Sequence, residues 1–331
     1  MDQARDFLER AFAEFERKAF SIEDHWHIDH LCYRTSTQEL YLSTKKKFAS
    51  FAELLVESEV NGRLISTFKL TSPLVFREWE IDLIEVPAPK KGKIVADGFE
   101  HLEIVCDLPF DQIKSRYPQC RFEESGLSKG FNQELEIPFG GFAVKFHHLS
   151  LESVIALEVN ERIFTAVNES GVLEFLRPFS PLIAGTFPLG LDVAGSDVDV
   201  LISGDLRLAK DILLERSGGF REFNIQEMMV QGVPTLFASF SSGGADFEIF
   251  GQETPSVNQR GYRHFLIEER LLKMGGTTFR RKVREAREVG LKTEPAFAKV
   301  LGLKGDPYEE LLVLQKRSNQ ELKNHLASCG K

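Results

Sequence analysis

Gly185-Thr186-Phe187-Pro188-Leu189-Gly190 and, shortly afterwards, Ser196-Asp197-Val198-Asp199 decide the fold of the second half of the chain. Side chains alternate between two faces in an extended segment, so Asp197 and Asp199 point the same way and Val198 points into a core. Two like charges this close repel each other unless a cation lies between them. Because oxygen ligands suit Mg²⁺ or Mn²⁺, the pattern predicts a divalent cation beside a glycine turn that can hold a phosphate.

This arrangement resembles the nucleotidyltransferase superfamily, in which a glycine and a hydroxyl residue precede Asp-x-Asp on a strand. Thr186 stands where that superfamily usually has Ser. The superfamily needs a third carboxylate on a neighbouring strand, and Glu248 is favoured for it, with Asp246 in reserve. The alternative is that Asp-Val-Asp merely ends an edge strand at a loop.

The resemblance implies transfer of a nucleotidyl group from a nucleoside triphosphate to an unidentified acceptor. Asp197 and Asp199 would hold Mg²⁺ on the triphosphate, and the third carboxylate would favour deprotonation of an acceptor hydroxyl. Gly185, Thr186 and Ser196 would position the phosphates. A basic run from Arg280 to Arg287 could guide a nucleotide, or could be an ion-paired helix face.

The second half also resembles an uncharacterised bacterial domain family, from about Phe164 onward. The phrases that carry this resemblance are Gly185 to Gly190, Glu248-Ile249-Phe250-Gly251-Gln252, Gly261-Tyr262-Arg263-His264, Lys292 to Lys299 and Gly305-Asp306-Pro307-Tyr308. Elements expected here include helices at 169–179 and 206–217, strands at 235–240 and 246–250, and helices from residue 257 onward. Asp306 before Pro307 predicts the start of the last helix.

Length and composition favour a two-domain protein with ample core. The chain has 331 residues, of which 42% are hydrophobic, and we expect domains at 1–160 and 161–331. The net charge of −9 does not favour nucleic acid as a partner, although a local basic patch could serve one. Four cysteines without metal-type spacing, a charged N-terminus and no long apolar run predict free thiols, no membrane span and a cytoplasmic location.

The first half contains a weak internal sequence repeat. Asp29-His30-Leu31 opens one series of elements and Glu100-His101-Leu102 opens another. After an amphipathic helix at 2–20, the first series has a strand at 28–34, a helix at 38–55, strands at 63–70 and 79–86 and a loop at 87–93. The second has a strand at 99–106, a helix at 110–116, strands at 134–137 and 142–147 and a closing helix at 151–158. This predicts a duplicated βαβββ unit.

Four residues of the first half form a candidate ligand set. His30, His101 and His147 lie on expected strands, and Glu85 lies near the end of another. Imidazole and carboxylate together suit Fe²⁺, Mn²⁺, Zn²⁺ or Ni²⁺. The spacing is too wide for a local motif, so the set works only if the fold brings the strands together. Glu103 faces the same way as His101 and is a candidate base or spare ligand.

The first half resembles the YecM family of the vicinal oxygen chelate superfamily, which includes glyoxalase I. The matching residues cover roughly 20–158 and are Asp29-His30-Leu31 with Arg34, Asn61-Gly62-Arg63, Phe68-Lys69-Leu70, Glu85 with Pro87, Gly98 to Glu103 and Lys145-Phe146-His147. The superfamily takes its metal ligands from the first and last strands of each module, which implies His30, Glu85, His101 and His147 here. One departure is His147, where glyoxalases usually offer a carboxylate.

These patterns predict an α+β protein of two domains: paired βαβββ vicinal-oxygen-chelate modules, then a nucleotidyltransferase-like α/β domain with C-terminal helices. The leading hypothesis is metal-dependent nucleotidyl transfer in the second domain, with a divalent-metal site in the first. A second hypothesis makes the first domain an isomerase, lyase or dioxygenase acting on a small oxygenated metabolite. A third is a non-catalytic protein that senses ligands at both sites. Chelate-fold domains often pair, which leaves a homodimer open.

Overall fold

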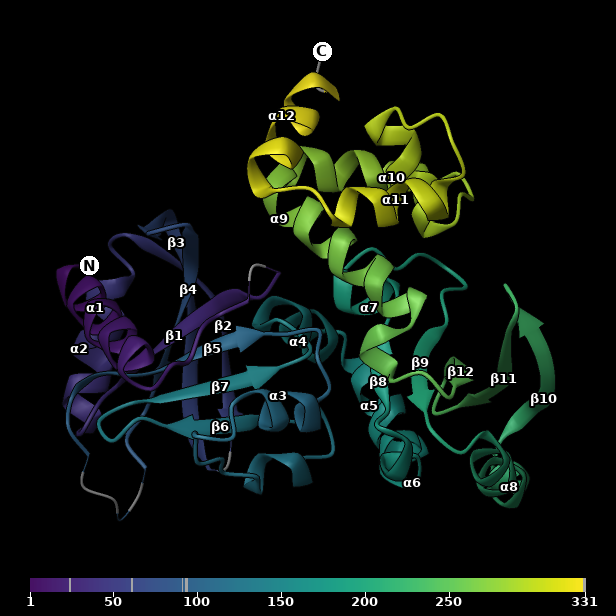
Figure 1. The fold of residues 1–331 in the computed structure, drawn as a ribbon, viewed down its shortest axis with the longest axis horizontal. Coiled ribbons are helices and arrows are strands. Elements are labelled where there is room, and N and C mark those ends of the chain that lie inside the picture. Colours follow the sequence, from purple (N-terminus) through teal and green to yellow (C-terminus); the bar gives the residue numbers. More distant parts are fainter. Residues whose placement is uncertain (24, 61, 91, 93–94, 330–331) are drawn as a thin grey trace. The chain divides into compact units, whose positions relative to one another are not determined.

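The computed structural model describes residues 1–23, 25–60, 62–90, 92 and 95–329, which form two units, Met1–Leu151 and Glu152–Lys331. Asn61, Lys91 and Lys93, which belong to patterns quoted above, lie outside the described residues. Each unit has a β-sheet of its own (Figure 1), with seven strands in the first and five in the second over the described residues. The protein is therefore a mixed α and β structure with two sheets.

The first unit begins with a helix and continues as two series of strands and helices. Its elements are α1 (Asp2–Arg17), β1 (His27–Arg34), α2 (Gln38–Phe48), β2 (Ala52–Val60), β3 (Arg63–Phe76), β4 (Trp79–Pro87), β5 (Gly98–Val105), α3 (Phe110–Arg116), β6 (Leu135–Pro138) and β7 (Ala143–His147).

The order of strands in the first sheet is β2-β3-β4-β1-β5-β7-β6. In each series the first strand lies parallel to the last, β1 beside β4 and β5 beside β7, and the remaining pairs are antiparallel. The predicted duplication is thus visible in the topology. The second copy is reduced, because an isolated bridge between Glu123 and Glu136 stands where the first copy has a strand.

One face of this sheet forms the main core of the unit. Helices α1, α2 and α3 send apolar side chains onto it, among them Phe7, Tyr41 and Ile113. Phe7 stacks on Phe99 of β5 with ring centroids 5.9 Å apart. The opposite face is therefore left for the polar side chains of the strands.

The prediction of a helix from 38 to 55 was wrong in its second half. Thr37 caps α2 by accepting a hydrogen bond from the backbone N–H of Leu40, and the helix ends at Phe48. Residues from Ala52 onward then form the edge strand β2 against β3. Its largely exposed side chains give no clear alternation of polar and apolar residues, so the strand could not be seen in the sequence.

The second unit starts with short helices and ends in a helical region. Its elements are α4 (Leu151–Val159), α5 (Glu161–Ser170), α6 (Val172–Phe175), β8 (Leu182–Ala184), α7 (Thr186–Leu189), β9 (Val198–Ser203), α8 (Leu206–Arg216), β10 (Arg221–Val230), β11 (Val233–Ser242), β12 (Ala245–Gln252), α9 (Arg260–Glu288), α10 (Thr293–Leu301), α11 (Pro307–Gln315) and α12 (Asn319–Cys329).

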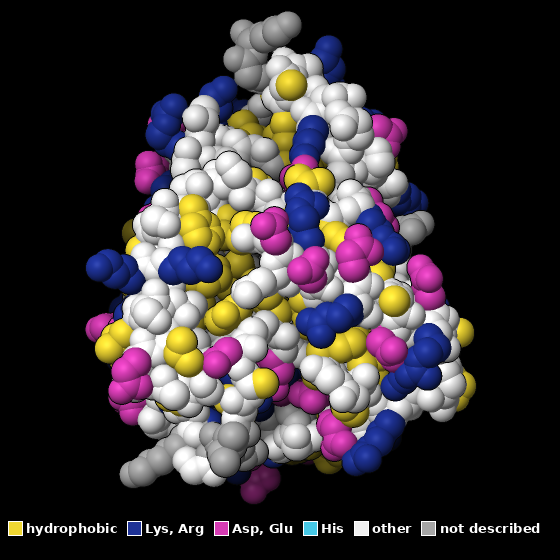
Figure 2. Space-filling view, turned by 90° about the vertical axis from the view of Figure 1, so that its left-hand side faces the viewer, with side chains coloured by type: hydrophobic (Ala, Val, Ile, Leu, Met, Phe, Trp, Pro, Cys, Tyr) yellow, Lys and Arg dark blue, Asp and Glu magenta, His cyan; other side chains and the backbone are white. Residues whose placement is uncertain are grey.

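The second sheet has the order β10-β11-β12-β9-β8, in which β12 and β9 are parallel and the other neighbours are antiparallel. Helix α9 is interrupted at Gly276, whose φ of 62° and ψ of −163° are not helical, and α10, α11 and α12 pack against it. In the described part of the chain, no helix has the length and apolarity that a bilayer crossing requires. Basic and acidic side chains are interspersed over the face drawn in Figure 2.

Three features of the second unit differ from what the sequence predicted. The helix expected at 169–179 is divided at Gly171, whose positive φ of 65° ends α5 and precedes the short α6. Strand β10 was missed because it lies at the sheet edge with mostly exposed side chains. The division between units falls at Leu151, before the expected 160, because the helix that follows joins the second unit, where Ser153 donates a hydrogen bond to Glu269.

Candidate functional sites

Alternation along the strands of the first sheet collects polar side chains on the face away from the helices. In β5, Leu102 and Ile104 enter the core, so His101 and Glu103 point to the opposite face. Strand pairing then brings neighbours together. The pairing of β1 with β5 sets His30 opposite Glu103.

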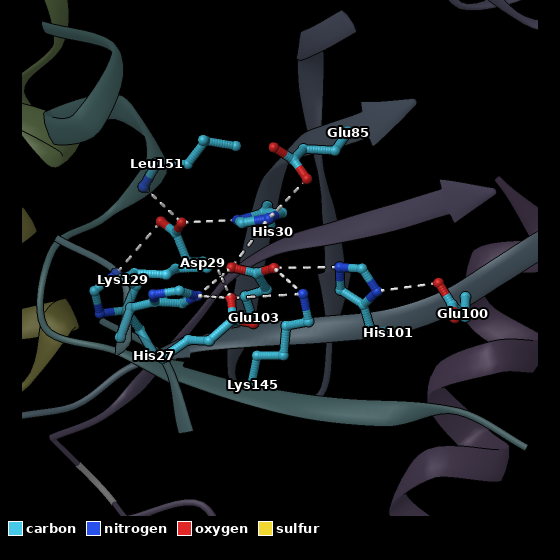
Figure 3. A network of polar contacts seen from close by, with 12 residues as sticks. His27, Asp29, His30, Glu85, Glu100, His101, Glu103, Lys129, Lys145 and Leu151 are labelled. Atoms are coloured by element: carbon cyan, nitrogen blue, oxygen red, sulfur yellow. Dashed lines mark hydrogen bonds and ion pairs between the residues drawn. The ribbon is translucent and has the colours of Figure 1, made fainter. Parts of the chain in front are cut away.

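Glu103 lies at the centre of the resulting cluster (Figure 3). Its carboxylate oxygens lie 2.7 Å from Nε2 of His147, 3.2 Å from Nε2 of His101 and 3.5 Å from Nε2 of His30. Nζ of Lys145, from β7, lies 3.6 Å away. Glu85, from β4, comes within 3.7 Å of Nε2 of His30. Four strands of the sheet therefore contribute to one site.

Over the described residues, four imidazole nitrogens in this cluster are buried without a well-oriented hydrogen-bond partner. They are Nε2 of His30, His101 and His147, which lie near Glu103, and Nδ1 of His147. Buried polar atoms are normally satisfied, and those that are not call for an explanation such as a missing ion. Three nitrogens that converge on a carboxylate form a donor set that suits a divalent transition metal.

Carboxylates behind two of the histidines hold the ring orientations. Oδ2 of Asp29 lies 2.9 Å from Nδ1 of His30 and also accepts a hydrogen bond of 2.8 Å from the backbone N–H of Leu151. Oε2 of Glu100 lies 3.3 Å from Nδ1 of His101. When these Nδ1 atoms carry the proton, the Nε2 lone pairs face Glu103, which is the tautomer that binds metals.

The charges in the cluster shift several pKa values. Burial alone would lower the pKa of His30, but the charge of Glu103 and the hydrogen bond with Asp29 raise it well above its usual value. Burial would raise the pKa of Glu103, yet His30, His147 and Lys145 hold it well below its usual range. Burial also opposes the charge of Lys145, but Glu103 and Glu134 raise its pKa. Without a metal, the cluster is therefore a set of cations around Glu103.

The site includes every metal-ligand candidate predicted for the first half. The fold brings together His30, Glu85, His101 and His147, although they are far apart in sequence. Glu103, for which the sequence left open the role of a base or of a spare ligand, lies at the centre of the cluster. Lys145 was missed as a member. Its position two residues before His147 on one strand was the available signal, since such residues share a face. Potential ligand atoms come within mutual reach in two groupings, His30 with Glu85 and Glu103, and Cys32 with Glu100 and His101.

All four cysteines are free thiols in the structure, as expected. Three of them, Cys32, Cys106 and Cys120, are buried. Burial raises the pKa of the Cys106 and Cys120 thiols.

The second unit brings its predicted carboxylates together at the parallel pair of β9 and β12. Asp199 on β9 is the register partner of Glu248 on β12, and Asp197 lies just before β9. Asp246 lies two residues before Glu248 and accepts a hydrogen bond of 2.5 Å from the hydroxyl of Ser241. The register places Glu248, the favoured third carboxylate, directly beside Asp199.

Burial and like charges raise the pKa values of this acidic cluster. Burial, Glu248 and Asp197 raise the pKa of Asp199 to about 7. Burial is also the main cause that raises the pKa of Asp197 and of Glu248. Glu268 of α9 was missed by sequence analysis; burial and then the charge of Glu294 raise its pKa well above the usual value. No motif marks Glu268, because its place depends on how α9 packs.

The glycine turn and the basic run have mainly structural contacts. Gly185, with φ of 76°, packs so closely on Asp199 that a Cβ would come within 1.9 Å of Oδ2. Thr186 is buried. The hydroxyl of Ser196 accepts from the backbone N–H of Val193 (2.9 Å) and from Nη2 of Arg287 (3.3 Å). The basic run thus holds the loop before β9 and also forms an ion pair, Arg281 to Glu285 at 2.6 Å.

Two family models match the chain, one for each half. The model described as YecM protein matches residues 1–158, and the model described as domain of unknown function DUF4269 matches residues 165–314. The second match agrees with the resemblance noted from about Phe164.

Three proteins to which this chain is similar each match less than half of it. Protein YecM of Escherichia coli is 30% identical over 148 residues, which cover 40% of this chain and 77% of the relative. A structural-genomics protein, EC4020, is 27% identical with a TM-score of 0.40, covering 47% of this chain and 90% of the other. Methylmalonyl-CoA epimerase of Streptomyces coelicolor is 13% identical with a TM-score of 0.28, and the match covers 37% of this chain and 92% of the epimerase. TM-scores this low do not establish a shared fold.

Proposed function

Because the chain belongs to the YecM family through residues 1–158, we propose that its N-terminal unit is a metal-dependent enzyme for a small oxygenated metabolite. One observation carries the proposal: three buried imidazole nitrogens from three strands converge on the carboxylate of Glu103 without hydrogen-bond partners of good geometry among the described residues.

The residues fit a divalent transition metal. His30, His101, His147 and Glu103 would hold it, with Glu85 as a further ligand beside His30. When bound, such a metal supplies Lewis acidity to adjacent substrate oxygens. Asp29 and Glu100 keep the two imidazole rings oriented, and metal binding must displace the protons that His30 and His101 hold in its absence.

The protonated amine of Lys145 favours an isomerase or lyase over a dioxygenase. Glu103 and Glu134 raise its pKa, so Lys145 remains a cation inside a buried site. An ammonium group there can donate a hydrogen bond to a substrate oxygen on which negative charge develops, as when a proton leaves the carbon beside a carbonyl.

Metal analysis of purified protein is the first test. We expect one equivalent of Zn²⁺, Mn²⁺, Fe²⁺ or Ni²⁺ per chain after loading, and loss of it in His101→Ala and in Glu103→Gln. His25→Ala is the matched control, because His25 pairs with Asp107 and is half exposed. Metal content that stays the same in both site variants would refute the metal centre.

The reaction class is tested by exchange of solvent deuterium into a panel of 2-oxo and 2-hydroxy acids. Metal-dependent exchange that is weakened at least tenfold in Lys145→Gln supports the proposal. A protein that binds metal and metabolite tightly but exchanges nothing would instead be a ligand sensor.

A second function, nucleotidyl transfer in the C-terminal unit, is favoured by the register that sets Asp199 beside Glu248 and close to Asp197. Mg²⁺ is the expected ion for this all-oxygen set. Transfer from α-labelled nucleoside triphosphates should occur with Mg²⁺ and disappear in Asp197→Asn. Asp211→Asn, an exposed change on α8, is the control. Absence of any triphosphate-dependent thermal shift would remove this second function.

A further inference from the structure

The first unit has a cavity of about 110 Å³ lined by Arg34, Arg63, Lys90 and Val95. Its lining comes from the end of β1, the start of β3 and the segment after β4. About 10–15 Å³ of such space admits one water molecule. The cavity therefore has room for a carboxylate or a phosphate group.

The cavity concentrates positive charge in a chain whose net charge is −9. Nη2 of Arg34 pairs with Glu100 at 2.5 Å, while Nε of Arg34 is buried without a partner among the described residues. Arg63 donates to the backbone carbonyl of Ala88 at 3.3 Å. Within the described ranges, neither Arg63 nor Lys90 has a carboxylate at ion-pair distance. Two cations around the cavity are thus left without a counter-charge.

A short chain of contacts joins this cavity to the metal centre. Glu100 contacts Arg34 on one side and Nδ1 of His101 on the other, at 3.3 Å. Arg34 lies four residues after His30 on the same strand, which is a separation of about 13 Å along an extended chain. A substrate that reaches both places must therefore be extended over a distance of that order.

We propose that this cavity binds an anionic group of the substrate, a phosphate monoester or a second carboxylate, while the substrate's reacting oxygens lie at the metal centre. The inference rests on the proposed function of the N-terminal unit and narrows its substrate to an extended metabolite that carries a second anionic group. Guanidinium groups bind carboxylates and phosphates in a forked geometry, and the free Nε of Arg34 with the unpaired Arg63 supplies such donors.

The test is binding of inorganic phosphate and of malonate to the full chain, followed by calorimetry and by ³¹P line broadening. We expect at least one of the two anions to bind, with affinity reduced at least tenfold in Arg63→Gln and abolished in the double variant Arg63→Gln/Lys90→Gln. Lys46→Gln, an exposed change on α2, should leave binding unchanged. Preference for phosphate or for malonate identifies the group on the substrate.

Failure of this subsite can be told apart from failure of the metal centre. Metal content should stay at the wild-type level in Arg63→Gln/Lys90→Gln, and phosphate or malonate should still bind to His101→Ala. If neither anion binds wild-type protein, or if the double variant binds them as well as wild type does, the inference is overturned even when metal binding stands.

Discussion

At the scale of residues, the two sites differ in the charge of one central carboxylate each. Glu103 stays ionised because His30, His147 and Lys145 surround it, whereas burial and like charges keep a proton on Asp199. In the environment of Glu103, a metal ion would bind by replacing protons on the histidines. In the environment of Asp199, a cation would bind by replacing the proton on the carboxylate.

Asp199→Asn should stabilise the metal-free protein near neutral pH. The folded pKa of Asp199, about 7, lies above the usual 3.8. The folded state thus binds the extra proton between these values, and stability falls as pH rises through that window. A shift of three pH units in the pKa corresponds to at most about 4 kcal/mol in the free energy of unfolding. In EDTA, the unfolding temperature of Asp199→Asn should therefore exceed that of wild type most above about pH 7 and least near pH 4. Parallel pH profiles for variant and wild type would contradict this.

Gly185→Ala should destabilise the second unit and displace Asp199. A Cβ at Gly185 would lie 1.9 Å from Oδ2 of Asp199, in addition to the strain of a positive φ, which costs about 1–2 kcal/mol. Gly195 has a positive φ of 82° and open space around it. Gly195→Ala therefore measures the backbone strain alone. Equal losses of thermal stability in the two variants would show that the contact with Asp199 does not matter.

At the scale of elements, caps and alternation were visible in the sequence, whereas two of the four edge strands in the described residues were not. Asp306 caps α11 as expected, but α11 is not the last helix, because α12 follows it. Helix α3 has the predicted bounds of Phe110 and Arg116. Strands β5 and β7 follow the alternation of apolar and polar residues. The edge strands β2 and β10 were not predicted, because most of their side chains face solvent and can be charged, which removes the alternation of polar and apolar residues.

Asp306→Ala should cost about 1 kcal/mol of stability, the usual value of an N-cap. The carboxylate of Asp306 accepts hydrogen bonds from the backbone N–H groups of Tyr308 (2.9 Å) and Glu309 (3.2 Å). Urea denaturation of the full chain gives the measurement. Asp306→Asn keeps an acceptor and should retain most of the stability, so an equal loss in both variants would count against the cap.

At the scale of the whole molecule, each unit has its own sheet and its own buried core. All members of the metal centre, from Asp29 to His147, lie within the first unit. The proposed metal centre of the first unit therefore needs no residue of the second unit.

A fragment of residues 1–158 should fold alone and bind metal with the stoichiometry of the full chain. It contains the seven strands of the first sheet and the three helices that cover it over the described residues. Circular dichroism and metal analysis of the fragment are the measurements. A fragment that folds but binds no metal would place part of the site elsewhere.

The sequence by itself determined the candidates: the histidines, the Asp-x-Asp pair, the duplicated order of elements and the resemblance of the first half to its family. These follow from local rules of alternation, capping and motif spacing, which act over a few residues. Tertiary structure alone decided that Glu103 is the centre, that Lys145 and Glu268 belong to the clusters, and that Arg34, Arg63 and Lys90 share a cavity. Such neighbours are set by strand register and helix packing between distant segments, and no local pattern records them.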